Sequence, residues 1–277
     1  MFQEILALGA LDYFPCRYGT SRLMFRGPKK SLDEPYLAFI GSTETYGKFI
    51  PKPFPDLIEN VIGTTCVNFG QMNAGIDAFA YDPFVLEAAS QAEVTVVQIL
   101  GAHNMTNRFY SVHPRRNDRF VEAATLLKTI YREVDFANFH FNKHMLSTLL
   151  QRSPDRFEAV QRELQEAWKA RMRLMLKRIQ RKSVLLWFSD HAPEDELPFL
   201  FDTIGTEPLF VTREMIEEIS PLATAVVEVV VSREALDAGT DGMNFSDLEE
   251  PAAAEMFNPM AHQEAADALL KVIKQIM

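Results

Sequence analysis

Five short apolar runs, each followed by a turn-rich or helix-like segment, constrain the fold of this chain most strongly. They span residues 36–41, 64–70, 93–101, 183–190 and 224–232. Runs that are apolar at nearly every position are typical of strands buried on both faces of a parallel sheet. We therefore predict an α/β fold, a three-layer sandwich with a central parallel sheet of about five strands, flavodoxin-like in kind.

The spacing of these runs predicts one α/β domain over residues 1–277, which is within the size range of a single domain. Residues 1–35 are rich in turn formers and predict an N-terminal arm. Residues 118–182 are too long for a single crossover and predict a helical insertion between the third and fourth strands. Its expected helices cover residues 118–131, 136–150 and 155–182, and a further short strand is expected at residues 208–211.

Charge and motif content exclude several classes of protein. The net charge of −10 argues against a nucleic-acid or anionic-membrane binder, whose binding surface would be basic. Cys16 and Cys66 provide neither a disulfide framework nor metal-ligand spacing, and no strand is followed by a Gly-rich nucleotide-binding loop. We expect no metal or other cofactor and no nucleic-acid partner.

The N-terminal residues lack the basic start of a signal peptide, and no apolar run reaches the ~20 residues of a transmembrane helix. We therefore expect a cytoplasmic protein with no transmembrane segment. The long helix expected at residues 155–182 makes a homodimer reasonable.

Polar residues gather where the expected strands end. The first strand ends in Phe39–Gly47, FIGSTETYG, an apolar stretch that breaks into a glycine and a run of small hydroxyls. In open α/β sheets, ligands bind at the carboxyl ends of the strands, close to helix N-termini. The later strand ends add Asn68, Gly70, Gln71, Asn73, His103, Asn104, Asn107, Arg108, Asp190 and His191.

These short blocks resemble those of the SGNH (GDSL-like) hydrolase and acyltransferase superfamily. Residues 41–47 are similar to its first block, and the resemblance implies Ser42 or Thr43 as nucleophile. It also implies an oxyanion hole formed by the Gly70 N–H and the Asn104 side chain, donors typically worth ~10²–10³ in rate.

The last catalytic block departs from the superfamily pattern. Where that block reads DxxHP, this chain has Glu255-Met-Phe-Asn258-Pro259, so the usual Asp and His are replaced. His262, four residues further on, is then the candidate base. The chain also resembles a group of bacterial proteins without a known activity, through the stretches ETYGKF, VNFGQMNAG and HPRRNDRF.

An arginine cluster follows the third strand. Its members are Arg108, Arg115, Arg116 and Arg119. Arginine binds carboxylate, phosphate or sulfate through two hydrogen bonds, so this cluster predicts an anionic substrate, with Asn73 and His103 as further binding residues. Local salt bridges with nearby acids explain the cluster equally well.

Three functions remain open from the sequence. The first is an SGNH-like ester hydrolase or acyltransferase acting on a small or carbohydrate-linked, anionic substrate. The second is a sulfotransferase-like enzyme that binds an anionic donor through the arginines. The third is a non-catalytic binding or assembly protein on a degenerate hydrolase-type fold, so whether the chain is an enzyme stays open.

Overall fold

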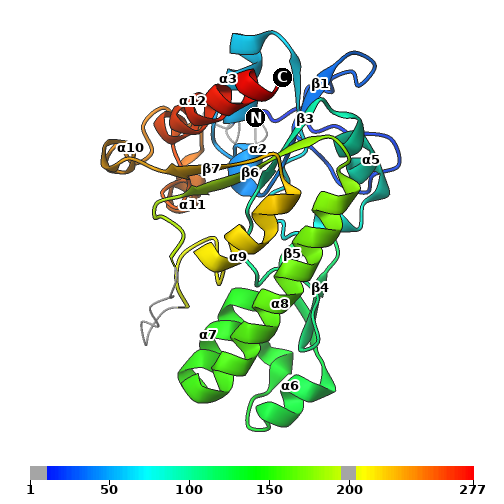
Figure 1. Cartoon of the computed structure of the whole chain (residues 1–277). Coiled ribbons are helices and arrows are strands. Elements are labelled where there is room, and N and C mark those ends of the chain that lie inside the picture. The colour runs from blue at the N-terminus through cyan, green and yellow to red at the C-terminus, as the bar shows by residue number, and fades with distance from the viewer. Residues whose placement is uncertain (1–10, 195–203) are drawn as a thin grey trace.

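The computed structural model describes residues 11–194 and 204–277, and its centre is a five-stranded parallel sheet (Figure 1). The strands lie in the order β2-β1-β3-β6-β7. Their bounds are Tyr36–Ile40 (β1), Thr65–Asn68 (β2), Val94–Gln98 (β3), Lys182–Ser189 (β6) and Ala225–Val230 (β7). The predicted parallel sheet is confirmed, and each of its five strands falls within two residues of the start of its apolar run.

The order of the strands determines where a ligand can bind. β1 pairs with β2 on one side and with β3 on the other, so the chain reverses its path across the sheet at this point. Such a reversal opens a crevice between the carboxyl ends of the two adjacent strands. Ile40, the last residue of β1, is the partner of Val97, one residue before the end of β3.

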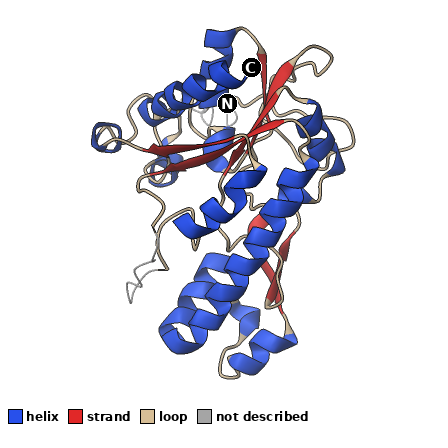
Figure 2. Cartoon of the chain, in the orientation of Figure 1, coloured by secondary structure: helices blue, strands red, loops and turns tan. Residues whose placement is uncertain are grey.

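Helices cover both faces of the sheet (Figure 2). On one face, Leu37 and Phe39 of β1 pack in a core with α3 (Phe54–Ile62) and α12 (Pro259–Ile276). On the other face, Ala38 and Ile40 join a core that includes α5 (Pro83–Gln91), α8 (Pro154–Arg178) and α9 (Arg213–Ile219). This alternation is what period-two side-chain geometry requires of a strand buried on both faces.

The insertion between β3 and β6 is only partly helical. It opens with an antiparallel hairpin of β4 (Tyr110–His113) and β5 (Arg116–Ala123). Three helical elements follow before α8: α6 (Thr125–Ile130), the 3₁₀ turn η1 (Phe136–Asn138) and α7 (Asn142–Arg152). The predicted helix at residues 118–131 was therefore wrong in its first half, because pairing with β4 holds residues 118–123 extended.

The long helix α8 packs as its pattern indicates. Its apolar stripe is buried, and the largest member, Trp168, donates its indole N–H to the backbone oxygen of Leu100 at 2.7 Å. The short strand predicted at residues 208–211 was wrong, since these residues form no strand. The remaining elements are α2 (Thr43–Tyr46), α4 (Asp77–Ala80), η2 (Ser220–Leu222), α10 (Arg233–Asp237), η3 (Asp247–Glu249) and α11 (Glu250–Ala253).

Residues 11–35 pack against the segments that follow β1 and β2. Phe25 is fully buried and packs edge-on against Phe69 after β2. Arg26 donates from its guanidinium to the backbone oxygens of Gly47 at 2.6 Å and Pro51 at 2.9 Å. Of the predicted N-terminal arm, residues 1–10 lie outside the described residues. No helix in the described segments is long and apolar enough to cross a membrane.

Candidate functional site

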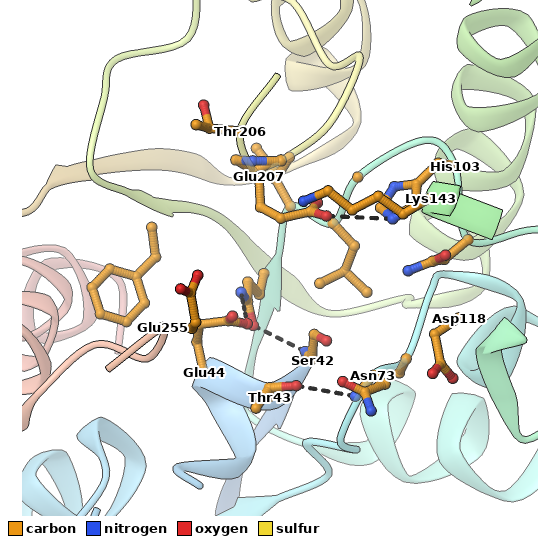
Figure 3. Close-up of a pocket in the computed structure, with 18 of the residues that line it drawn as sticks. Ser42, Thr43, Glu44, Asn73, His103, Asp118, Lys143, Thr206, Glu207 and Glu255 are labelled. Atoms are coloured by element: carbon orange, nitrogen blue, oxygen red, sulfur yellow. Dashed lines mark hydrogen bonds and ion pairs between the residues drawn. The ribbon is translucent and has the colours of Figure 1, made fainter. Parts of the chain in front are cut away.

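A cavity of about 550 Å³ opens at the carboxyl edge of the sheet (Figure 3). Its floor is formed by residues at the ends of β1, β3 and β6. The crevice lies between β1 and β3, and β6 is the neighbour of β3. The loop before α12 and the start of α7 close it from two sides. The polar lining residues include Ser42, Thr43, Glu44, Asn73, Gln98, His103, Asn104, Asp118, Lys143, Asp190, Thr206, Glu207 and Glu255.

Ser42 is the accessible hydroxyl of the first strand end. It occupies the N-cap position of α2, is half-buried, and lines the cavity. Thr43 also lines the cavity but is buried, and its hydroxyl accepts the backbone N–H of Asn73 at 3.0 Å. Of the two predicted nucleophiles, Ser42 is therefore the one whose hydroxyl makes no hydrogen bond to any described residue.

Gln98, the last residue of β3, organises this corner and was missed in the sequence. Its side-chain oxygen accepts the Ser42 N–H at 3.0 Å and the Thr45 hydroxyl at 2.6 Å. Its amide donates to the Glu44 carboxyl at 2.9 Å. A polar residue at the end of an otherwise apolar central strand was the only signal for this role.

Glu44 is the acid of the same corner. Burial raises the pKa of the Glu44 carboxyl above its ordinary value, although the hydrogen bond from Gln98 opposes the rise. The nearby Glu207 carboxyl raises it further. Glu44 is thus the carboxyl of this corner whose environment favours the protonated form.

The two predicted oxyanion donors have different surroundings. The Gly70 N–H donates to the Asn68 side chain at 2.8 Å and is therefore already engaged. Gly70 is also required by packing, because a Cβ there would lie 2.3 Å from the backbone nitrogen of Tyr46. Asn104 does line the cavity, and its side-chain oxygen accepts a hydrogen bond from Asn142 at 3.0 Å.

His103, predicted as a binding residue, lies in the cavity wall and is only 4% exposed. Its Nε2 lies 3.3 Å from a carboxylate oxygen of Glu207. Burial lowers the pKa of His103, against the opposing effect of the Glu207 charge. Its Nδ1 is buried and has no hydrogen-bond partner among the described residues.

His262, the predicted base, lies in the core behind the cavity and is 1% exposed. Its ring stacks on Phe54 and makes an edge-to-face contact with Phe188. Phe188 is itself a lining residue of the cavity. Its Nδ1 accepts the backbone N–H of Phe54 at 3.2 Å, and burial lowers the pKa of His262 to about 3. In the described chain no hydrogen bond joins His262 to either predicted nucleophile, so its assignment as base stays a prediction.

Asn258 stands where the superfamily pattern has its catalytic histidine, and its side chain is fully used in the structure. Its amide donates to the backbone oxygens of Ala235 at 2.6 Å and Gly239 at 3.0 Å. Its side-chain oxygen accepts the Ala261 N–H at 3.1 Å, which caps α12. Asn258 therefore holds the helix, whereas Glu255, three residues earlier, lines the cavity.

A second imidazole, His191, follows β6 directly after Asp190. Its Nδ1 is 2.7 Å from a carboxylate oxygen of Asp190 and 2.9 Å from the Ser189 hydroxyl. Asp190 lines the cavity. A carboxylate on Nδ1 orients an imidazole and leaves Nε2 as the basic nitrogen.

The arginine cluster lies outside the cavity lining. Arg108 pairs with Glu163 of α8, and Arg116 approaches Asp118 at 3.4 Å. Arg119 lies over the ring of Phe141 at 4.3 Å from its centroid, and Arg115 is exposed at the tip of the hairpin. Local salt bridges, the alternative explanation of the cluster, therefore account for Arg108 and Arg116.

Carboxylates dominate the charged lining of the cavity. They are Glu44, Asp118, Asp190, Glu207 and Glu255. Among the lining residues that the structure describes, Lys143 is the one lysine, and none is an arginine. An acidic cavity repels anions, so the charge of this lining disfavours binding of the anionic substrate that the sequence predicts. Within residues 11–194 and 204–277, no group of three or more His, Cys, Asp or Glu side chains is arranged to hold a metal ion.

The solved structures that resemble this chain include two lipases of low sequence identity. A lipase from a goat rumen metagenome has a TM-score of 0.41 and 10% identity, covering 85% of this chain and 96% of its own. An extracellular lipase from Streptomyces rimosus has a TM-score of 0.40 and 8% identity, covering 88% of this chain and all of its own. The assignment of the fold rests on the sheet itself. A search of the curated proteins gave no match.

The comparison with family models gave a match over the whole chain. The matching model is described as a domain of unknown function, DUF6473, and it covers residues 1–277. The chain therefore belongs to the DUF6473 family.

Proposed function

We propose that the protein binds a small polar molecule in the carboxyl-edge cavity and holds it against the Ser42 hydroxyl. The observation that carries this proposal is the cavity itself: about 550 Å³, at the strand-order reversal, and lined by polar side chains from the segments that follow β1, β2, β3 and β6. Pockets for small molecules have volumes of ~300–1,000 Å³ and lie preferentially at such reversals.

Ligand-induced stabilisation tests this proposal. A panel of small alcohols, amines and acids is added to the full chain, and the melting temperature is measured for each. A compound present at 100 times its Kd stabilises the folded state by ~2.7 kcal/mol, which is readily detected.

A pair of variants links the stabilisation to the cavity. Ser42→Tyr places a ring at the cavity wall and should abolish the shift, whereas Ser31→Tyr at an exposed position should preserve it. The proposal fails when no compound raises the melting temperature, or when both variants respond alike.

A second function, ester hydrolysis or acyl transfer on the bound molecule, is favoured by one specific observation. Asp190 orients the His191 ring through Nδ1 and lines the same cavity as the half-buried Ser42 hydroxyl. In this reading, Ser42 attacks the acyl carbon, and the imidazole accepts the proton that the hydroxyl loses. Asn104 would donate its amide to the resulting oxyanion.

Short aryl esters and acyl donors test this second function. Ser42→Ala should remove turnover, while Thr43→Ser at the buried neighbour should retain it. Comparing His191→Gln with His262→Gln then decides which imidazole acts as base. Absence of turnover in the wild-type protein, together with intact ligand-induced stabilisation, assigns the cavity to binding without catalysis.

Sulfate transfer from an anionic donor lacks support of this kind, because the arginines that suggested it do not line the cavity. A nucleotide sulfate donor should therefore leave the melting temperature unchanged.

A further inference from the structure

At and behind one wall of the cavity lie buried polar atoms that have no hydrogen-bond partner among residues 11–194 and 204–277. They are Nδ1 of His103 and the side-chain oxygens Oδ1 of Asp118 and Asn142. His103 is 4% exposed and lines the cavity, and Asn142 is fully buried beside the lining residue Lys143. Buried polar atoms in folded proteins are almost always hydrogen-bonded, so a group of orphans indicates a missing partner.

Asn142 links the two chain segments that carry His103 and Asp118. The Asn142 amide donates to the side chain of Asn104, the neighbour of His103, at 3.0 Å. The same amide donates to the backbone oxygen of Asn117, the neighbour of Asp118, at 2.5 Å. Figure 3 shows His103, Asp118 and Lys143 on the same side of the cavity. The residues that carry the orphan atoms therefore lie on the same side of the cavity.

Each orphan atom is a hydrogen-bond acceptor. The Asn142 amide nitrogen is already a donor twice, which identifies the free atom as the oxygen. The His103 ring faces Glu207 with Nε2, so a proton on Nε2 leaves Nδ1 as an acceptor. A carboxylate such as that of Asp118 has only acceptor atoms. The missing partner is thus a hydrogen-bond donor.

The charge of the cavity specifies the donor further. Among the residues that the structure describes, five carboxylates and one lysine line it, and this lysine, Lys143, forms no ion pair with any of them. A positively charged donor would satisfy both the orphan acceptors and the excess of negative charge. An ammonium group supplies three N–H donors and one positive charge.

We propose that the small molecule bound in this cavity is an amine, whose ammonium group docks on the wall formed by His103 and Asp118, with Asn142 buried behind them. This inference rests on the proposed binding function and specifies its ligand class. Lys143 is the competing ammonium, because its side chain lines the same wall and is free to turn toward Asp118.

Matched sets of probes separate charge from shape. Each set keeps one skeleton and varies one group: glucosamine, glucose and glucuronate; serinol, glycerol and glycerate; benzylamine, benzyl alcohol and benzoate. Calorimetric titration of the full-length chain measures each Kd. We expect at least one amine to bind, its alcohol to bind roughly 10-fold or more weakly, and its acid not to bind.

Two substitutions locate the ammonium site. Asp118→Asn removes one charge without changing shape and should weaken amine binding roughly 10- to 100-fold, whereas Asp241→Asn at an exposed position should leave it unchanged. Lys143→Met removes the competing ammonium and should tighten amine binding. The wild-type Kd should also rise with added NaCl, because salt screens the attraction between the ammonium and the carboxylates.

The outcomes distinguish failure of this inference from failure of the binding function. When no probe binds, both the amine inference and the proposed binding function are refuted. When alcohols or acids bind at least as well as the matched amines, the binding function stands and the amine inference is overturned. Amine binding that survives Asp118→Asn and is insensitive to both NaCl and Lys143→Met also overturns it.

Discussion

The buried imidazole of His262 should make the protein sensitive to mild acid. Its ring lies between Phe54 and Phe188 in the core, where burial lowers its pKa to about 3, whereas an exposed histidine has a pKa of 6.5. Between these values the unfolded chain takes up a proton that the folded chain excludes. Stability contributed by the neutral ring is therefore complete above pH 6.5 and is lost as the pH falls toward 3.

The size of the effect follows from proton linkage. Each pH unit within this window costs about 1.4 kcal/mol, because one proton more is bound by the unfolded state. Lowering the pH from 7 to 5 should thus reduce the free energy of unfolding by about 2 kcal/mol through His262 alone. Carboxylates and His103 also titrate, so the contribution has to be read as a difference between variants.

Urea unfolding at pH 7 and pH 5 measures that difference. His262→Gln retains an acceptor for the Phe54 N–H but cannot take up a proton, so it should lose about 2 kcal/mol less than the wild type between the two pH values. His140→Gln, at an exposed position, should lose as much as the wild type.

Equal losses in the wild type and His262→Gln would refute the reasoning. That result would mean that His262 is protonated in the folded protein, and hence that it is not enclosed between the two aromatic rings. It would also restore His262 as a base available to Ser42.

Three further substitutions test other features of the site. Gly70→Ala should destabilise the protein by ~2–3 kcal/mol or more in urea unfolding, because its Cβ would lie 2.3 Å from the Tyr46 nitrogen. Asn258→Ala should cost ~2–4 kcal/mol, since it removes the cap of α12 and the amide that donates to the buried carbonyl oxygen of Ala235 and to that of Gly239. Glu44→Gln should raise the melting temperature at pH 7, because burial raises the pKa of Glu44 and its charge therefore opposes folding. The gain should disappear at pH 4, where the folded wild type is already protonated at this carboxyl.

Each of these substitutions has a matched control. At Gly63 an added Cβ meets no atom within 4 Å, so Gly63→Ala carries only the cost of its positive φ and should cost less than Gly70→Ala. Asn138→Ala and Glu34→Gln are exposed and should have little effect. A Glu44→Gln gain that persists at pH 4 would show that shape, and not charge, limits stability at this corner.

The sequence by itself determined the architecture of this protein. Five runs apolar at nearly every position specified a sheet buried on both faces, because only a strand covered by helices on both sides tolerates such a pattern. The same logic placed Ser42, Asn73, His103 and Asn104 at one sheet edge, and all four line the cavity. The helical stripe of residues 157–179 was likewise confirmed as core.

The tertiary structure alone decided the composition of the site. Gln98 and Glu207 join the cavity from a strand end and a distant loop, and neither carries a local motif. The burial of His262 depends on Phe54, which is more than 20 residues away in the sequence. The hydrogen bond of the Gly70 N–H to Asn68 depends on the backbone geometry of the turn, which residue spacing does not encode. The hairpin at Tyr110–Ala123 overrode a local helical pattern by pairing with its partner strand. Local periodicity specifies which face of an element is buried, but the charge and hydrogen bonding of a site are set by residues brought together only when the chain folds.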